Sequence, residues 1–332
     1  MLAFIPQKQN TNAMKRIIAV VLTLVLFGTL TACDIQNKKE EEIQAYPVQV
    51  ANVTVEAQPE KVACLSPSLT EILFEHGYGD KVVIRTDDAD YPESVKEIPS
   101  AGKTGHLDTA AIVAALPDIV LTHDSLSKKD IEALETAKIQ VVVLPMAKNL
   151  EELKTLYQNI GLLFLGQKDG RRAGADQFAK MESGINDIKA KLPAEAANST
   201  FLYIINPNGI IATGDTFESS ILSVFGTNAA EAATGYTADA KEMQAKDPDF
   251  IFVADPYGLP HLQSNAAYKD FGAVKNGKVY TIDNTLFALQ SSRVLEVIQK
   301  TAVALYPDAF DESAGESSEQ TASGLVVSVA SK

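Results

Sequence analysis

Few cysteines and few cations mark this chain of 332 residues, and each shortage excludes a class of protein. Its 29 lysines and arginines face 43 aspartates and glutamates, so the formal net charge is −14. Nucleic acids are bound by clustered cationic side chains, so we expect no nucleic-acid partner. The two cysteines are Cys33 and Cys64. Cys64 lies in the apolar run KVACLS, where a free thiol usually packs as a small hydrophobic side chain.

The short motifs of common catalytic sites are also missing. The chain has no GxSxG nucleophile elbow, no HExxH zinc site, no GxxxxGK[ST] phosphate loop and no GxGxxG turn. Ser68 precedes a predicted helix and Glu71 follows three residues later, a spacing typical of a capping box rather than of a nucleophile. We therefore expect a protein that is not an enzyme and needs no cofactor.

The N-terminal apolar stretch is too short to span a bilayer comfortably and has the pattern of a signal peptide. Ile17 to Phe27 covers 11 residues and follows Lys15 and Arg16. The sequence LTAC, ending at Cys33, resembles the bacterial lipobox. This resemblance implies that Cys33 is lipidated and anchors the protein on the outer face of the cell membrane. A cleaved signal with an incidental cysteine is the alternative.

These signals set the expected ends of the mature protein. Residues 1–32 form the signal peptide, with Met14 as the expected start of translation. These residues hold three cations and no acid, so without them the net charge is −17. Lipidation of Cys33 would leave Cys64 without a disulfide partner. Residues 33–57 are expected to be the lipidated cysteine and its tether, and residues 311–332, rich in Ser, Gly and Glu, a disordered tail.

Between these ends, short β-branched runs alternate with helical patterns, which indicates parallel sheets covered by helices. Strands are predicted at Lys61–Ser66, Lys81–Thr86, Ile119–Thr122, Gln140–Leu144, Phe201–Ile205, Phe250–Ala254 and Val279–Ile282. Helices are predicted at Ser68–His76, Asp108–Ala115, Lys128–Lys138, Asn149–Leu165, Asp169–Leu192, Phe217–Phe225, Ala238–Lys246 and Ser292–Leu305.

The predicted fold is α/β, with two three-layer lobes joined by one long helix and a cleft between them. The helix at 169–192 lies mid-chain, between an N-terminal lobe at 58–168 and a C-terminal lobe at 193–310. One continuous sheet with a long crossover helix is the alternative. An internal echo favours two lobes, because DTAAIVAALPDIVLTHD, from Asp108, matches DAKEMQAKDPDFIFVAD, from Asp239. In both, an aspartate is a plausible helix N-cap and stands nine residues before the proline of a Pro-Asp pair.

Four segments in order resemble the solute-binding lipoproteins of ABC importers for chelated metals, most of all the vitamin B12-binding members. They are VACLSPSLTEILFEHGYGDKVV, DADYP, IPSAG and AALPDIVLTH, and YKDFGAVKNGKVYTIDN with SSRVLEVI resembles the closing segment of that family. The resemblance covers about residues 46–308. It implies two α/β lobes joined by one long helix, with a corrinoid, haem or ferric siderophore held in the cleft.

Ligands of open α/β sheets bind beyond the carboxyl ends of the strands. This rule places the candidate site in six loops, at residues 85–91, 103–108, 123–126, 206–217, 255–262 and 283–293. His106, His123 and His261 lie in these loops and are candidates to contact a ligand, His123 or His261 as an axial metal ligand. All three could equally be polar loop residues, and His76, inside a helix, is expected to be structural. Other candidate contacts are Asp88, Tyr91, Phe217, Tyr257, Phe287 and Arg293. For Arg293 the alternative is a helix-start residue paired with a local acid.

The sequence departs from the family pattern in two places. Corrinoid-binding relatives often carry aromatic residues where this chain has Asp88, Thr104 and His123, and it has no tryptophan. Relatives also often place a permease-docking glutamate in each lobe, where this chain has Ala110 and Lys241. Nearby acids that could dock instead are Asp108, Asp239 and Glu242.

We therefore interpret the chain as a monomeric, lipid-anchored binding component of an ABC importer, with a permease and its ATPase as partners. A corrinoid such as cobalamin is favoured as the ligand, with haem or a ferric siderophore as the alternative. A surface chelate sensor or scavenger without a permease is the alternative from another class.

Overall fold

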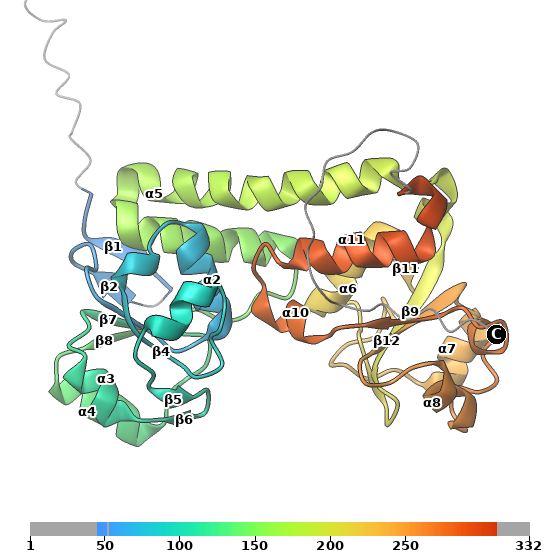
Figure 1. Cartoon of the computed structure of the whole chain (residues 1–332), viewed down its shortest axis with the longest axis horizontal. Coiled ribbons are helices and arrows are strands. Elements are labelled where there is room, and N and C mark those ends of the chain that lie inside the picture. Colours follow the sequence, from blue (N-terminus) through green and yellow to red (C-terminus); the bar gives the residue numbers. More distant parts are fainter. Residues whose placement is uncertain (1–44, 52, 311–332) are drawn as a thin grey trace, which may run out of the picture. The chain divides into compact units, whose positions relative to one another are not determined.

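The computed structural model describes residues 45–51 and 53–310, which form two α/β lobes connected by a long helical segment (Figure 1). The expected fold class is thereby confirmed. The signal peptide, Met14, Cys33 and the tail at 311–332 lie outside the described residues and stay predictions. Among the described residues no strand pairing joins the two main sheets, so the alternative of one continuous sheet is wrong.

The N-terminal lobe is built on a four-stranded parallel sheet in the order β4-β3-β7-β8. Its strands are β3 (Val62–Cys64), β4 (Val82–Arg85), β7 (Ile119–Thr122) and β8 (Gln140–Val143), and its helices are α2 (Pro67–Glu75), α3 (Thr109–Ala114) and α4 (Lys128–Thr136). Both faces of the sheet are buried, one against α3 and α4 and the other against α2 and α5, as expected for short continuous apolar runs. Cys64 is fully buried and burial raises its pKa to about 11, which confirms its prediction as a packing residue.

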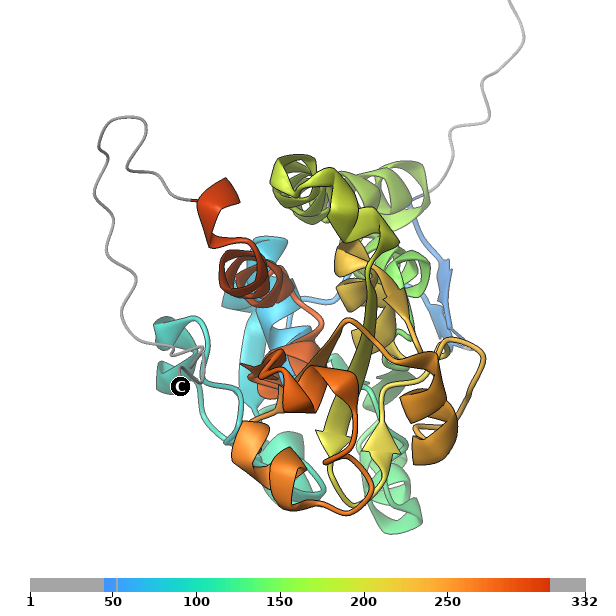
Figure 2. The ribbon, with the colours of Figure 1, turned by 90° about the vertical axis from the view of Figure 1, so that its right-hand side faces the viewer.

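The C-terminal lobe has a second sheet in the order β10-β9-β12-β13, with β11 also paired to β9. Its strands are β9 (Thr200–Asn206), β10 (Ile210–Ile211), β11 (Thr227–Asn228), β12 (Phe250–Ala254) and β13 (Val279–Ile282). Its helices are α6 (Phe217–Leu222), α7 (Ala240–Lys246), α8 (Leu259–Ser264), α9 (Gly272–Lys275), α10 (Thr285–Leu289) and α11 (Val294–Leu305). Helices α6 and α11 pack on one face and α7 to α9 on the other (Figure 2).

Segment α5 (Leu150–Lys191) is a hairpin of two helical arms, because Gly166 has φ 72° and ψ −171° and breaks the helix there. The arms pack back to back (Figure 1) through three glycines, Gly161, Gly170 and Gly174. A Cβ atom on any of them would collide with backbone of the facing arm, so glycine is required for this approach. The second arm contains the helix predicted at 169–192, and α11 packs against α5.

The internal echo corresponds to a repeated structure. Asp108 and Asp239 accept hydrogen bonds from backbone N–H groups at the starts of α3 and α7, as predicted for N-caps. The aspartates of the two Pro-Asp pairs also act alike. The Asp118 carboxylate accepts from the N–H of Lys61 at 2.9 Å, and the Asp249 carboxylate accepts from the N–H of Thr200 at 2.7 Å. Each aspartate therefore ties the amino end of its strand to the neighbouring strand.

Three details differ from the sequence analysis. The N-cap of α2 is Ser66, whose Oγ accepts from the N–H of Leu69, so the capping box assigned to Ser68 and Glu71 is wrong. Pro67 at the first helical position explains the shift, because proline is favoured there. Two segments expected to be tether, β1 (Val48–Val50) and β2 (Val53–Val55), pair as antiparallel strands with buried valines. A second small hairpin, β5 (Gly102–Lys103) and β6 (His106–Leu107), was not predicted.

Short 3₁₀ segments complete the described secondary structure. They are η1 (Gly79–Lys81), η2 (Glu93–Glu97), η3 (Ala194–Asn198), η4 (Ser223–Phe225) and η5 (Pro307–Ala309). Within residues 45–51 and 53–310, no helix combines the length and the apolar content needed to cross a bilayer.

Besides α5, a polar network connects α2 of the N-terminal lobe to the segment that precedes α11. Glu71 accepts hydrogen bonds from Ser291 Oγ and from Arg293 Nη1, the latter at 3.0 Å. Glu75 accepts from the N–H and the Oγ of Ser292 at 2.8 and 2.6 Å. The side chain of Glu71 is only 3% exposed, so the ion pair with Arg293 is largely shielded from water. Specific polar contacts thus link the two lobes.

Candidate ligand-binding cleft

The loops that follow strands of both lobes enclose a cavity of about 470 Å³. Its lining includes the buried rings of Phe217 and Phe287, which the sequence analysis named as candidate ligand contacts. The cavity is lined by Met146, Ala147, Lys148, Asp215, Thr216, Phe217, Glu218, Gly235, Tyr236, Asn284, Phe287, Ala288 and Gln290. This position, past the carboxyl ends of parallel strands and between two lobes, is where α/β proteins bind ligands.

The mouth of this cavity is unusually apolar for a surface. Met146 is 41% exposed and Tyr236 40% exposed, and both belong to the few large hydrophobic side chains that the described residues expose. Gln290 closes one wall through a reciprocal pair with Ala147, donating to its carbonyl oxygen at 2.6 Å and accepting from its N–H at 2.7 Å. Exposed aromatic and thioether groups beside a cavity favour ligand contact.

Two carboxylates give the cavity an acidic wall. Glu218 is only 9% exposed, accepts a hydrogen bond from Tyr236 Oη at 3.2 Å, and has a raised pKa because it is buried. Asp215 is exposed and accepts from Thr213 Oγ1 at 2.6 Å, which lowers its pKa. The cation lining the cavity is Lys148, and neither carboxylate forms an ion pair with any described residue. The wall can therefore accept hydrogen bonds from a bound molecule.

Tyr91 and Arg293, two further candidates, are brought together. The Arg293 guanidinium carbon lies 4.7 Å from the centroid of the Tyr91 ring, a cation–π contact. Arg293 also contacts Glu71 of α2 and, at 3.4 Å, Glu296 of its own helix. The pairing with Glu296 is the local arrangement that the sequence analysis left open. Since Arg293 already has these partners, it is not a free cation for a ligand in this conformation.

The candidate histidines occupy different environments. His123 donates from Nδ1 to the carbonyl oxygen of Leu144 at 2.6 Å, while its Nε2 is buried and has no partner among the described residues. Burial lowers the pKa of His123 and favours the neutral ring. His261 is exposed on α8 and packs edge-on against Tyr257, with ring centroids 5.6 Å apart. His106 is exposed in the β5–β6 hairpin. No hydrogen bond or ring contact joins these three histidines to one another.

The remaining predicted residues lie apart from the cavity. Asp88 is exposed and accepts a hydrogen bond from Thr104 at 3.1 Å. The structural role expected for His76 fits its packing between Tyr78 and Tyr157. The possible docking acids Asp108, Asp239 and Glu242 are exposed at the starts of α3 and α7. No described group of three or more His, Cys, Asp or Glu side chains is placed to hold a metal ion.

Sequence reasoning missed part of the cavity wall. Met146, Lys148, Glu218 and Tyr236 lie outside the loops assigned to the cleft, whereas Asp215 and Gln290 fall within them but were not named as contacts. The carboxyl-end rule could have found Met146 and Lys148, which follow β8 directly. Nothing in the sequence pattern marks Glu218, because its position on the cavity wall depends on the register of α6.

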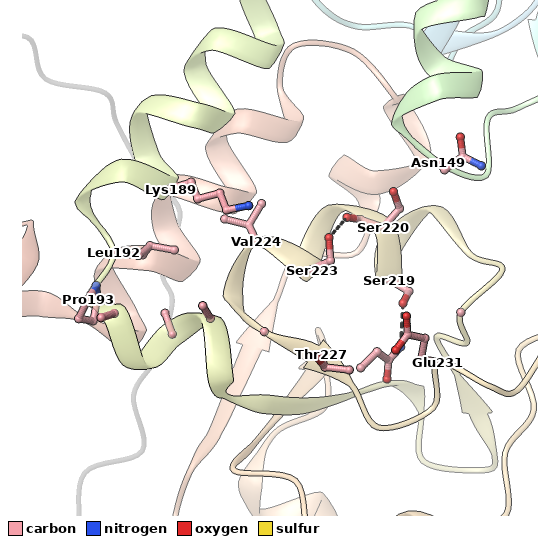
Figure 3. Close-up of a pocket in the computed structure, with 16 residues that line it drawn as sticks. Asn149, Lys189, Leu192, Pro193, Ser219, Ser220, Ser223, Val224, Thr227 and Glu231 are labelled. Carbon is pink, nitrogen blue, oxygen red and sulfur yellow. Dashed lines mark hydrogen bonds between the residues drawn. The ribbon is translucent and has the colours of Figure 1, made fainter.

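A second cavity, of about 580 Å³, lies on another part of the C-terminal lobe (Figure 3). Its lining includes Lys189 near the end of α5, Ser219, Ser220 and Ser223 of α6 and η4, and Thr227 of β11. Thr227 pairs with Thr200 at the amino end of β9, so this cavity adjoins the edge of the sheet away from the carboxyl ends. Its lining is mainly small residues, and we place the candidate site in the acidic cavity instead.

Comparison with known proteins decides the family. Residues 62–286 match the family described as periplasmic binding protein. The chain belongs to this family. The match spans both lobes and the connecting helical segment, and it confirms the resemblance found in the sequence.

Among similar proteins, this periplasmic binding protein is 28% identical over 288 residues to the uncharacterized ABC transporter substrate-binding lipoprotein YvrC of Bacillus subtilis. The alignment covers 83% of this chain and 91% of YvrC. This chain is also 23% identical to the vitamin B12-binding protein of Vibrio campbellii. That alignment covers 72% of this chain and 86% of the relative. A structure of a possible iron-binding protein from Staphylococcus epidermidis has the same fold, with a TM-score of 0.66, 20% identity and coverage of 75% and 100%.

Proposed function

We propose that this protein is the substrate-binding component of an ABC importer and captures a metal chelate, with a corrinoid such as cobalamin favoured. The observation that carries the proposal is the family match across both lobes, together with a cavity at the carboxyl ends of their strands. The names of the two relatives support this role, one as a transporter component and one as a binder of vitamin B12. Phe217 and Phe287 would present a flat apolar surface to a macrocycle.

The proposed mechanism is capture and delivery without chemistry on the ligand. The lobes would close around the chelate by a limited movement about α5 and hand it to a permease driven by an ATPase. Because a ligand that contacts both lobes binds the closed state best, its binding shifts the population toward closure. The boundaries of the lobes at 58–168 and 193–310, with 169–192 as the link, belong to this proposal.

We also propose that the protein acts as a monomer held to the outer face of the cell membrane by a lipid on Cys33. The relative YvrC is named as a lipoprotein, which supports this arrangement. Docking to the permease would use Asp108, Asp239 or Glu242, because Ala110 and Lys241 carry no acid. Labelling with a fatty-acid analogue should mark the wild type and spare Cys33→Ser, and equal labelling of both would contradict the anchor.

Haem is the second candidate ligand, and the neutral ring of His123 is the observation that favours it. A neutral imidazole with a free nitrogen is a suitable axial ligand for iron. Nε2 of His123 is buried, so the ring or its loop must shift before this nitrogen meets a ligand. His261 would contact the ligand from the other lobe. The further proposed contacts, which do not line the cavity in this conformation and would reach the ligand only on closure of the lobes, are His106, Tyr91, Asp88, Tyr257 and Arg293.

Titration of the purified protein with cobalamin, haem and ferric siderophores tests the proposal. At least one should give a saturable signal, and mass spectrometry of material carried through native purification should identify the natural ligand. Failure of all three, with tight binding of a sugar or a peptide, would overturn the chelate. Genes for a permease and an ATPase beside this one would separate an importer component from a sensor or scavenger without a permease.

A further inference from the structure

The charge of the cavity between the lobes distinguishes among the chelates that the proposed function leaves open. Its two carboxylates, Glu218 and Asp215, face one lysine, Lys148, which lies beyond ion-pair distance of both. The six loops at the carboxyl ends of the strands are acidic as well. They carry Asp87, Asp88, Asp90, Asp108, Asp124, Asp215, Asp255 and Asp283 against Arg85, Lys103 and Arg293.

The cations of these loops are mostly engaged. Arg85 is buried and donates to the carbonyl oxygens of Val95 and Thr86, each at 2.8 Å. Arg293 is paired with Glu71 and Glu296. A carboxylate or phosphate on a ligand would therefore find few available cations here, and it would meet like charge at the acidic wall.

Glu218 is the most informative member of the wall. It is nine-tenths buried, and its donors among the described residues are the Tyr236 phenol, the Thr216 hydroxyl and its own backbone N–H, with no cation paired to it. A buried carboxylate without a cation is destabilising unless hydrogen-bond donors satisfy it. The cavity that it lines is where such donors can enter, since Tyr236 at the mouth is 40% exposed.

We infer that this cavity selects chelates whose rim carries uncharged amide groups or other hydrogen-bond donors, and that Glu218 and Asp215 disfavour chelates with a carboxylate rim. This inference rests on the proposed function and narrows its ligand. In this arrangement Phe217 and Phe287 contact the face of the ligand, while the acidic wall accepts hydrogen bonds from its rim. The amide side chains of a corrinoid or the backbone amides of a hydroxamate siderophore suit this wall, whereas haem propionates and ferric citrate do not.

Matched ligand pairs that differ at the rim test the inference on the purified protein. The first pair is cobinamide, with an amide rim, and cobyrinic acid, with carboxylates on the same corrin. The second pair, a ferric trihydroxamate and ferric citrate, differs in the whole scaffold and compares an amide-bearing chelate with a carboxylate-bearing one. We expect the amide-bearing member of at least one pair to bind at least tenfold more tightly. Equal binding, or tighter binding of the carboxylate members, would overturn the rim preference while leaving the chelate function intact.

Variants of the two carboxylates then test whether the acidic wall causes the preference for an amide rim. Glu218→Gln and, separately, the exposed Asp215→Asn should each reduce the ratio of affinities within the pair at least threefold, mainly by improving binding of the carboxylate member. Glu231→Gln, an equivalent change beside the other cavity, should leave the ratio unchanged. If Glu218→Gln does not fold, as judged by circular dichroism, Asp215→Asn alone decides. An unchanged ratio in the folded variants contradicts the inference. Failure of every chelate in the wild type rejects the proposed function as well.

Discussion

The two lobes are alike at the amino ends of their strands and different at the carboxyl ends. At the amino ends, Asp118 and Asp249 follow a proline in each lobe, and each accepts a hydrogen bond from a backbone N–H at the start of the neighbouring strand. The donors are Lys61, just before β3, and Thr200, the first residue of β9. At the carboxyl ends, the N-terminal lobe provides Met146 and Lys148 to the cavity, and the C-terminal lobe provides aromatic rings and both carboxylates. The amino ends of the strands, which the lobes share, support the fold. The carboxyl ends, where the lobes differ, carry the candidate site.

The hydrophobic cores of the two lobes also differ, because one is mainly aliphatic and the other mainly aromatic. The sheet of the N-terminal lobe is packed with aliphatic side chains such as Val62, Ile119 and Leu121. The sheet of the C-terminal lobe is packed with aromatic rings. The ring centroids of Phe201, Phe250 and Phe252 lie between 5.2 and 6.4 Å apart. The aromatic core continues through Tyr203 to Phe287, whose ring centroids lie 5.9 Å apart, and so reaches the cavity lining. The apolar surface of the site is thus an extension of one lobe's core.

The largest effect is expected where the lobes are joined, on replacing Arg293. Arg293→Ala removes the cation from Glu71, whose side chain is 3% exposed, and should lower the free energy of unfolding by about 3 kcal/mol. Burial already raises the pKa of Glu71 in the folded protein, and loss of the cation raises it further. A carboxyl with a raised folded pKa loses stability as pH rises, so the variant should be worst near pH 7 and recover toward pH 4.

Denaturant unfolding at both pH values measures this difference. Arg172→Ala is the matched control, because Arg172 pairs with Asp169 on the exposed surface of α5. We expect the control to change the unfolding free energy by less than about 1 kcal/mol. Equal losses for the two variants would show that the contact between Glu71 and Arg293 does not join the lobes energetically.

A smaller effect tests the likeness of the amino ends directly. Asp118→Ala and Asp249→Ala each remove an acceptor for two hydrogen bonds at the start of a strand. Each should lower the free energy of unfolding by about 1 to 2 kcal/mol, and the two losses should agree within about 0.5 kcal/mol. A large loss in one lobe and none in the other would show that the echo is a sequence likeness without a shared structural role.

The sequence predicted best the bounds of short strands, which depend only on residues next to one another in the chain. β7, β12 and β13 begin and end where they were predicted, because each is a short apolar run that leaves little choice of bounds. The hairpin of α5 was predicted as two separate helices, but their packing through Gly161 and Gly174 was not, since it depends on residues meeting across a turn. In the site, the carboxyl-end rule found Phe217 and Phe287, whereas the order of strands and the burial of Glu218 come only from tertiary packing.

Histidine burial shows the same limit. His123 and His261 follow corresponding strands and were predicted to have equivalent roles, yet one is largely buried and the other exposed. Chain position places a residue in a loop but does not show whether its ring packs inward. Here His123 turns toward the end of β8 and donates to Leu144, and His261 lies on α8 beside Tyr257.

The smallest expected effect is on the pH dependence of stability, and it tests the difference between His123 and His261. Burial lowers the pKa of His123 in the folded protein, so only the unfolded chain takes up this proton as pH falls through about 6.5. The stability that His123 contributes is therefore present above pH 6.5 and lost below it, with a slope of at most about 1.4 kcal/mol per pH unit.

His123→Gln should flatten the decline of the unfolding free energy between pH 7 and pH 5, and His261→Gln should leave it parallel to the wild type. The buried His76 adds the same slope to all three proteins, so it does not affect the comparison. Parallel curves for all three would contradict the lowered pKa of His123 in the folded protein.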